Sequence, residues 1–324
     1  MSVLIPVLSR TPNLLPELVK ALPSVKFHKV TDPEVDIHFK KSEILICDFD
    51  LLGPYLYDLP SVKWVQGTWA GIDKLTPLIQ KEKQLPYQIT RFTGEHFGRI
   101  MSEYVVANIV NHERNFFQVR SNQDKQEWNR HGKITGYRVI SDLTTGILGL
   151  GNIGSRIGKT LYALGATVLA FGRRPALPDG NEYSHVSKYY TKETLPLFLK
   201  ECDYIINVLP KTDETDGILD NDVLENSAEK KSVLINIGRS NVISEESIIR
   251  ALDNNWISAA IIDVYDVEPL PQNNPLWQMK QVFLTPHVAG MSRAKDIADQ
   301  FQKNLDLYNK KVPLPGLIDF NRGY

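Results

Sequence analysis

Cysteine is scarce in this chain, which has 324 residues and only Cys47 and Cys202. Two thiols are too few for a disulfide scaffold, and they lie too far apart for a paired metal motif. Low cysteine usage favours a reducing compartment. The first residues lack a basic leader with a long apolar stretch, so they are interpreted as a strand and not as a signal peptide. We therefore expect a cytoplasmic protein. An organellar form, made from a longer transcript, is an alternative that the sequence leaves open.

Net charge and long apolar runs are lacking too. The chain has 37 Lys and Arg against 38 Asp and Glu, which gives a formal charge of −1. That balance supplies no positive field for nucleic acid or for an anionic membrane surface. No apolar run approaches the roughly 20 residues that span a bilayer. We therefore expect a small neutral or anionic ligand, with neither nucleic acid nor membrane as a partner.

The sequence does contain a regular alternation of short apolar runs and longer segments with a polar face. The runs are rich in Ile, Val and Leu, as strands covered by helices on both faces must be. This alternation predicts crossover units and an α/β fold with parallel sheets, and the length favours two domains. The expected strands span residues 3–7, 43–47, 62–67, 145–148, 166–171, 204–209, 232–237, 259–264 and 282–285.

Residues 111–143 interrupt this rhythm, because they are polar, charged and aromatic without strand character. The segment is interpreted as an arm. Its Arg114, Phe116, Phe117 and Trp128 could pack against a second subunit, which would make the protein a homodimer. An equally good interpretation is a solvated helix with a few tucked aromatic side chains.

A glycine-rich turn follows the run at 145–148 and precedes a helical segment. Gly149 permits a tight turn, Gly151 lets the backbone approach a pyrophosphate, and Gly154 lets helix and strand pack closely. The start of such a helix, at Asn152 and Ile153, offers free N–H groups to phosphates. We therefore predict a dinucleotide site here. The alternative is a glycine-rich turn without a ligand.

Two arginines stand where the cofactor's adenosine ribose would be recognised. A fold of this kind that prefers NAD carries an acidic residue about 20 residues after the turn. Here the next strand is followed by Arg173 and Arg174. Guanidinium groups bind a 2′-phosphate, so we predict NADPH/NADP as the cofactor, with NADH possible but weaker. The alternative is that both are solvated loop charges.

Three later strands are each followed by an ionisable residue: Arg239, Glu268 and His287. Parallel sheets bind ligands at the carboxyl ends of their strands. Hydride transfer to a 2-keto acid needs a cation for the carboxylate and a proton donor at the ketone, tasks that suit Arg239 and His287. Glu268 would orient the imidazole and stabilise its protonated form. Taken alone, Arg239 could equally be a surface charge, Glu268 a solvated loop acid, and His287 a partly buried histidine whose hydrogen bonds are satisfied within the fold.

Taken in order, these motifs resemble the D-isomer-specific 2-hydroxyacid dehydrogenase family over nearly the whole chain, and most of all its glyoxylate/hydroxypyruvate reductases of the A type. The matching segments are 149–154, 233–240, 262–271, 275–278, 285–289 and 321–324. The resemblance implies NADPH-dependent reduction of a small 2-keto acid, with Arg239, Glu268 and His287 as the catalytic residues. It also implies a Rossmann cofactor domain at 99–288, inserted into a flavodoxin-like substrate domain formed by 1–98 and 289–324.

The resemblance implies further contacts with the ligands. Backbone N–H groups of Ala70 and Gly71 would bind the substrate carboxylate, beside Trp69, which could equally be a core aromatic. Asp263 would accept from the nicotinamide carboxamide, although it could instead cap a turn. The other implied cofactor contacts are Met101, by default a core methionine, with Leu209, Pro210, Thr215, Ile237 and Gly290.

Other functions remain compatible with the same motifs. Dehydrogenases of formate, phosphite or phosphoglycerate share the cofactor domain, and a dehydrogenase for a bulkier 2-keto acid would share all of it. A nucleotide-sensing corepressor can also retain the three ionisable residues. Sequence does not rank the 2-keto acids, because a few side chains of the pocket wall decide between them.

Overall fold

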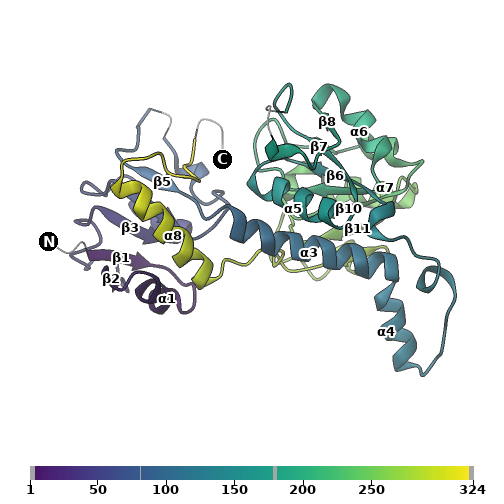
Figure 1. Cartoon of the computed structure of the whole chain (residues 1–324), viewed down its shortest axis with the longest axis horizontal. Helices are drawn as coiled ribbons and strands as arrows, with labels where there is room; N and C mark the ends of the chain where they lie inside the picture. The colour runs from purple at the N-terminus through teal and green to yellow at the C-terminus, as the bar shows by residue number, and fades with distance from the viewer. Residues whose placement is uncertain (1–3, 81, 178–180, 321–324) are drawn as a thin grey trace. The chain divides into compact units, whose positions relative to one another are not determined.

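The computed structural model describes residues 4–80, 82–177 and 181–320. The chain divides into two compact units (Figure 1). The first unit joins Met1–Phe97 to Met291–Tyr324, and the second is Gly98–Gly290. Among the helices of the described ranges, none combines the length and apolar character needed to cross a membrane.

The first unit is built on a five-stranded parallel sheet with the order β2-β1-β3-β4-β5. This is the flavodoxin-like order. Its C-terminal helix α8 returns to the sheet, where Phe301 stacks on Trp64 with ring centroids 5.3 Å apart. The strands are β1 (Leu4–Leu8), β2 (Lys26–Lys29), β3 (Ile44–Cys47), β4 (Trp64–Gly67) and β5 (Gln88–Thr90), and the helices are α1 (Leu14–Ala21), α2 (Phe49–Leu52) and α8 (Ala294–Asn309).

The second unit is built on a seven-stranded parallel sheet with the order β12-β11-β10-β9-β6-β7-β8. The order reverses between β6 and β9, which makes this a doubly wound Rossmann sheet. Its strands are β6 (Thr144–Leu148), β7 (Thr167–Phe171), β8 (Lys188–Tyr190), β9 (Tyr204–Asn207), β10 (Ser232–Asn236), β11 (Ile257–Ile262) and β12 (Val282–Leu284). Its helices are α3 (Glu95–Arg114, of which the part from Gly98 belongs here), α4 (Phe116–Asp124), α5 (Asn152–Ala163), α6 (Leu195–Glu201) and α7 (Glu245–Asp253).

The predicted fold class is confirmed: both units are parallel α/β sheets. Each expected strand corresponds to an observed one, although Val3, the first residue of the first expected strand, lies outside the described residues. The segment 321–324, which is one of those that resemble the family, lies outside them as well. Three strands were not predicted: β2, β5 and β8. All three are short strands at the outer edges of their sheets, and they carry polar residues that interrupt an apolar run.

The segment 111–143 contains no strand, as expected. It holds the end of α3, all of α4 and a long loop by which the chain returns from α4 to the sheet (Figure 1). Phe117 contacts Phe283 with ring centroids 4.9 Å apart, and the guanidinium of Arg114 lies 3.6 Å from the centre of the Tyr137 ring. Trp128, by contrast, is 93% exposed. Phe117 and Tyr137 thus have partners in the fold, although they are still 54% and 37% exposed, whereas Trp128 faces solvent.

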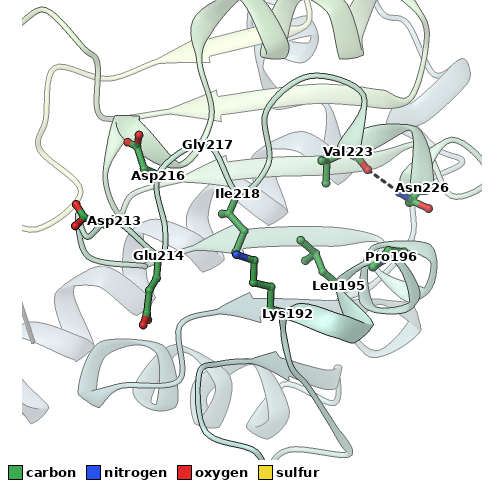
Figure 2. Close-up of a pocket in the computed structure, with 10 residues that line it drawn as sticks. All are labelled: Lys192, Leu195, Pro196, Asp213, Glu214, Asp216, Gly217, Ile218, Val223 and Asn226. Carbon is green, nitrogen blue, oxygen red and sulfur yellow. Dashed lines mark hydrogen bonds between the residues drawn. The ribbon is translucent and has the colours of Figure 1, made fainter.

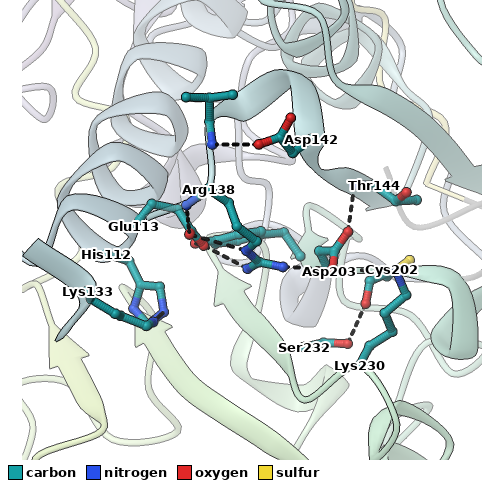
Figure 3. A network of polar contacts seen from close by, with 12 residues as sticks. His112, Glu113, Lys133, Arg138, Asp142, Thr144, Cys202, Asp203, Lys230 and Ser232 are labelled. Carbon is teal, nitrogen blue, oxygen red and sulfur yellow. Dashed lines mark hydrogen bonds and ion pairs between the residues drawn. The ribbon is translucent and has the colours of Figure 1, made fainter. Parts of the chain in front are cut away.

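Charged side chains join the end of α3 to the amino ends of the central strands (Figure 3). The carboxylate of Glu113 accepts hydrogen bonds from Arg138 Nη2 at 2.7 Å and from the Tyr204 hydroxyl at 2.8 Å. Arg138 Nη1 also donates to Asp203 at 2.8 Å, and Asp203 accepts from the backbone N–H of Thr144 at 2.8 Å. The carboxylates of Glu113 and Asp203 are buried, and both are paired with Arg138, whose own side chain is 44% exposed. Pairing is the condition for tolerating a buried charge.

Candidate active site

The glycine-rich turn has the geometry that a pyrophosphate requires. Gly149 has a φ of 103°, a conformation that favours glycine. A Cβ on Gly154 would lie 2.0 Å from the carbonyl oxygen of Gly149, so this position excludes any side chain. A Cβ on Gly151, in contrast, would meet no atom of the described residues within 4 Å. The open space over Gly151 is where a ligand can approach the backbone.

The start of α5 supplies donors to that space. Its first helical hydrogen bond runs from Ser155 N–H to the carbonyl of Gly151, at 2.8 Å. The N–H groups of Asn152, Ile153 and Gly154 therefore precede the hydrogen-bond ladder, and the helix dipole adds partial positive charge there. The residues fit a dinucleotide phosphate.

The loop that follows β9 packs against this turn. Leu209 is buried, and its side chain lies 3.2 Å from where a Cβ on Gly149 would stand. The hydroxyl of Thr215 donates to the carbonyl oxygen of Pro210 at 2.7 Å, which closes the loop on itself. Leu209 thus forms one wall of the turn, whereas the Thr215 side chain is engaged in shaping the loop.

Arg173 and Arg174 follow β7, as predicted. Arg173 Nη1 lies 3.7 Å from a carboxylate oxygen of Glu214, and both side chains are at least half exposed. Glu214 belongs to the loop after β9, so two strand ends meet at this ion pair. Nothing in the sequence singled out Glu214, because an acidic residue in a polar loop carries no recognisable pattern.

Glu214 also lines a cavity of about 390 Å³ beside α6. Figure 2 shows Lys192 reaching across this cavity toward Ile218. Three acidic residues stand on one wall, together with the apolar residues of α6 on the other. The lining residues are Lys192, Leu195, Pro196, Asp213, Glu214, Asp216, Gly217, Ile218, Val223 and Asn226.

The ionisable residues Arg239, Glu268 and His287 follow β10, β11 and β12, which are neighbouring strands of one parallel sheet. Their carboxyl ends therefore share an edge. His287 Nδ1 lies 2.8 Å from Glu268 Oε2 and 3.1 Å from Oε1. A carboxylate accepts hydrogen bonds, so Nδ1 carries a proton and Nε2 is the ring nitrogen left for a substrate. Arg239 Nη1 donates to the carbonyl oxygen of Gly238 at 2.7 Å.

The pair of Glu268 and His287 is held by its own loops. Glu268 Oε1 also accepts from the backbone N–H of Tyr265 at 3.1 Å, and the peptide bond between Glu268 and Pro269 is cis. The backbone of His287 has a φ of 54°, in the left-handed region. A non-glycine residue in that region is uncommon and persists only where neighbouring contacts impose it.

Asp263 supplies those neighbouring contacts. Its carboxylate is buried and accepts from the backbone N–H groups of Val288 and Ala289, at 2.8 and 2.9 Å. It also accepts from the hydroxyl of Thr285 at 2.5 Å. These contacts hold the turn of residues 285–289, in agreement with the alternative that Asp263 caps a turn. Its contact with a nicotinamide carboxamide stays a prediction.

The remaining predicted residues divide between the two units. Met101 in α3 and Ile237 after β10 are buried in the second unit, and Gly290 is its last residue. Ala70 and Gly71 follow β4 in the first unit. Trp69 packs against the apolar core of that unit, in agreement with the alternative of a core aromatic. Roles in ligand binding for these residues stay predictions.

A group of metal-ligand residue types occurs in the first unit. His96, Asp296 and Asp299 bring their ligand atoms within 4.8 Å of one another. The carboxylate of Asp296, however, accepts from Arg293 Nε at 2.5 Å and from Nη2 at 3.0 Å. A guanidinium bound to both carboxylate oxygens opposes a cation at the same place, so we assign no metal to this group.

Comparison with known proteins gives a consistent result. Residues 106–289 match the sequence profile described as the NAD binding domain of D-isomer specific 2-hydroxyacid dehydrogenase. A solved structure of a D-isomer specific 2-hydroxyacid dehydrogenase family protein from Aeromonas salmonicida is 28% identical, with a TM-score of 0.83, covering 99% of this chain and 100% of that one.

Two further solved structures cover the whole of this chain. A probable 2-hydroxyacid dehydrogenase from Rhizobium etli, in complex with NADP, HEPES and tartaric acid, is 25% identical over 100% of this chain and 99% of that one, with a TM-score of 0.81. An NADPH-dependent glyoxylate/hydroxypyruvate reductase from Sinorhizobium meliloti is 24% identical over 100% of both chains, with a TM-score of 0.79, and shares the fold.

Proposed function

Because the chain belongs to the D-isomer-specific 2-hydroxyacid dehydrogenase family, we propose that it uses NADPH to reduce small 2-keto acids, such as glyoxylate and hydroxypyruvate, to 2-hydroxy acids. The observation that carries the proposal is the 2.8 Å contact between His287 Nδ1 and the Glu268 carboxylate. It orients the imidazole with Nε2 available as a proton donor, which is the acid that reduction of a ketone needs.

The chain's own groups account for binding of the cofactor. N–H groups at Gly151, Asn152 and Ile153 would hold the pyrophosphate of the cofactor, whose reduced nicotinamide would supply the hydride. Arg173 and Arg174 would bind the 2′-phosphate, which favours NADPH over NADH. That the Rhizobium etli relative is described with NADP supports this preference. Leu209, Pro210 and Thr215 are assigned to the adenine side, and Met101, Ile237, Asp263 and Gly290 to the nicotinamide side.

The substrate is held by its carboxylate and protonated at its ketone oxygen. Arg239 would bind the carboxylate and polarise the ketone, with help from the N–H groups of Ala70 and Gly71. Protonated His287 gives the Nε2 proton to the oxygen, while Glu268 stabilises the imidazolium. Reduction therefore consumes a proton at His287, and the reverse oxidation needs the neutral ring.

The test is the loss of absorbance of the reduced cofactor, with NADPH and then NADH, on glyoxylate, hydroxypyruvate, pyruvate and a phenyl-substituted 2-keto acid. We expect turnover of glyoxylate and hydroxypyruvate with NADPH. Preference for the phenyl acid would overturn the substrate, and absence of turnover despite cofactor binding would overturn the enzymatic function and favour a nucleotide-sensing corepressor.

A variant of His287 separates catalysis from binding. His287→Asn suits the left-handed backbone at this position, since asparagine tolerates that region better than most residues. We expect kcat to fall by about 100- to 10,000-fold, the usual contribution of a general acid. The dissociation constant for NADPH, followed by quenching of tryptophan fluorescence, should change little. Retained turnover in this variant would remove His287 from the acid role.

We propose further that the arm of residues 111–143 pairs two copies of the chain into a homodimer. Phe116 is 48% exposed and Trp128 is 93% exposed in the single chain. Large aromatic side chains are enriched in protein–protein interfaces, so their exposure here favours burial against a second copy. Light scattering of the intact protein should give twice the mass of 36.8 kDa. Substituting Phe116 and Trp128 with Ser together should give monomers, and a monomeric wild-type protein would refute the pairing.

A further inference from the structure

We propose that Tyr104 is a positioning residue for His287, acting through the hydroxyl of Thr285 and the carboxylate of Asp263. The inference rests on the proposed role of His287 as the acid. It concerns how the loop of residues 285–289 is held, and it assigns a task to a helix residue that none of the sequence motifs include.

The first step is that one carboxylate holds both sides of His287. Thr285, two residues before it, donates its hydroxyl to Asp263 at 2.5 Å. Val288 and Ala289, directly after it, donate their N–H groups to the same carboxylate at 2.8 and 2.9 Å. Between these anchors the backbone of His287 takes its left-handed φ of 54°. The direction of the imidazole therefore depends on how firmly Asp263 binds its three donors.

The second step is the direction of the hydrogen bond to Tyr104. Its hydroxyl lies 2.6 Å from Thr285 Oγ1, so either oxygen could donate on distance alone. The single hydroxyl proton of Thr285 is directed to Asp263, because an ionised carboxylate only accepts. Tyr104 must then donate to Thr285. Burial raises the pKa of Tyr104 to about 12, so this donor keeps its proton throughout the working range of pH.

The third step is what the donor achieves. Because Thr285 Oγ1 accepts from Tyr104, its own O–H is kept directed at the carboxylate of Asp263, the one orientation that satisfies both partners. Hydrogen bonds in such a chain polarise and strengthen one another. Tyr104 lies on α3 and Asp263 follows β11, so the chain of bonds ties the His287 loop to a helix as well as to the sheet.

Tyr104→Phe tests this, because it removes one oxygen and keeps the ring. We expect kcat to fall about two- to tenfold, as loss of a single buried hydrogen bond implies, with an unchanged dissociation constant for NADPH. The side-chain NMR signals of His287, assigned with His287→Asn, should shift or broaden in the absence of any ligand. Thr285→Val should have the same effects, Thr285→Ser smaller ones, and Tyr104→Phe with Thr285→Val should not be additive.

The matched control is Tyr204→Phe. The Tyr204 hydroxyl is also buried and donates to Glu113 at 2.8 Å, but at the amino end of β9. Its loss should lower stability without changing kcat or the His287 signals. Equal effects of Tyr104→Phe and Tyr204→Phe on kcat, or unchanged His287 signals in Tyr104→Phe, would overturn the inference. Full activity of His287→Asn would instead remove His287 from the acid role, and absence of turnover in the wild type would overturn the proposed function, while the His287 signals still test the positioning.

Discussion

Acid should destabilise the second unit through His112. Lys133 Nζ lies 2.9 Å from His112 Nε2 (Figure 3), so the ammonium donates and the imidazole accepts in its neutral form. Burial, and then the charge of Lys133, lower the pKa of His112 from 6.5 to about 4. In the unfolded chain the ring takes up a proton near pH 6.5, whereas in the folded protein it stays neutral down to about pH 4. Stability is therefore full above pH 6.5 and falls as the pH drops through this window.

The size of the effect follows from the two pKa values. A separation of 2.5 units between 6.5 and about 4 corresponds to about 3.4 kcal/mol when the titration is complete. At pH 5 the same linkage gives a loss of about 2 kcal/mol.

The assay is urea unfolding at pH 7.5 and at pH 5, for the wild type and for His112→Gln. The glutamine amide oxygen can accept from Lys133 in place of Nε2, and it does not titrate. Other groups that titrate in this window contribute equally to both proteins. The wild type should lose about 2 kcal/mol more than the variant on going to pH 5. Equal losses in the two proteins would refute the reasoning.

Three further predictions concern the cofactor and the acid. Arg173→Asp should lower kcat/KM with NADPH about 10- to 100-fold, which is the contribution of a hydrogen bond to a charged group, and should leave kcat/KM with NADH nearly unchanged. An equal loss with both cofactors would refute the 2′-phosphate contact. Gly151→Ala should fold normally yet bind NADPH more weakly in fluorescence titration, whereas Gly154→Ala should unfold at lower urea because its Cβ meets Gly149. Reductive kcat/KM should fall with rising pH as His287 loses its proton, and a flat profile from about pH 5 to 9 would contradict the acid role.

Sequence patterns predicted most of the fold because the central strands are buried on both faces. Such strands must be apolar along their length, and β3, with four buried residues in a row, is an example. The edge strand β8 has the sequence KYY and an exposed first residue, so its pairing with β7 is decided by tertiary contacts. Short polar strands leave no periodic signal that could be recognised beforehand.

The candidate site was predictable where chemistry requires a residue type at a fixed place in the fold. The glycines of the turn and the strand-end positions of Glu268 and His287 belong to this class. The contact of Tyr104 with Thr285 does not, because 181 residues separate the two and neither residue type is diagnostic. The ion pair of Arg173 and Glu214 likewise joins two loops that meet only in the folded sheet.

The seven-stranded sheet has a different task at each end of its strands. Gly149 and His287 follow the carboxyl ends, whereas the charges of Glu113, Arg138 and Asp203 gather at the amino ends. Substitutions at well-separated positions add independently in their effects. Substitutions that adapt such a protein to heat or acid can thus occur at one end of the strands, and substitutions that change its substrate at the other. Neither set then limits which substitutions are tolerated in the other.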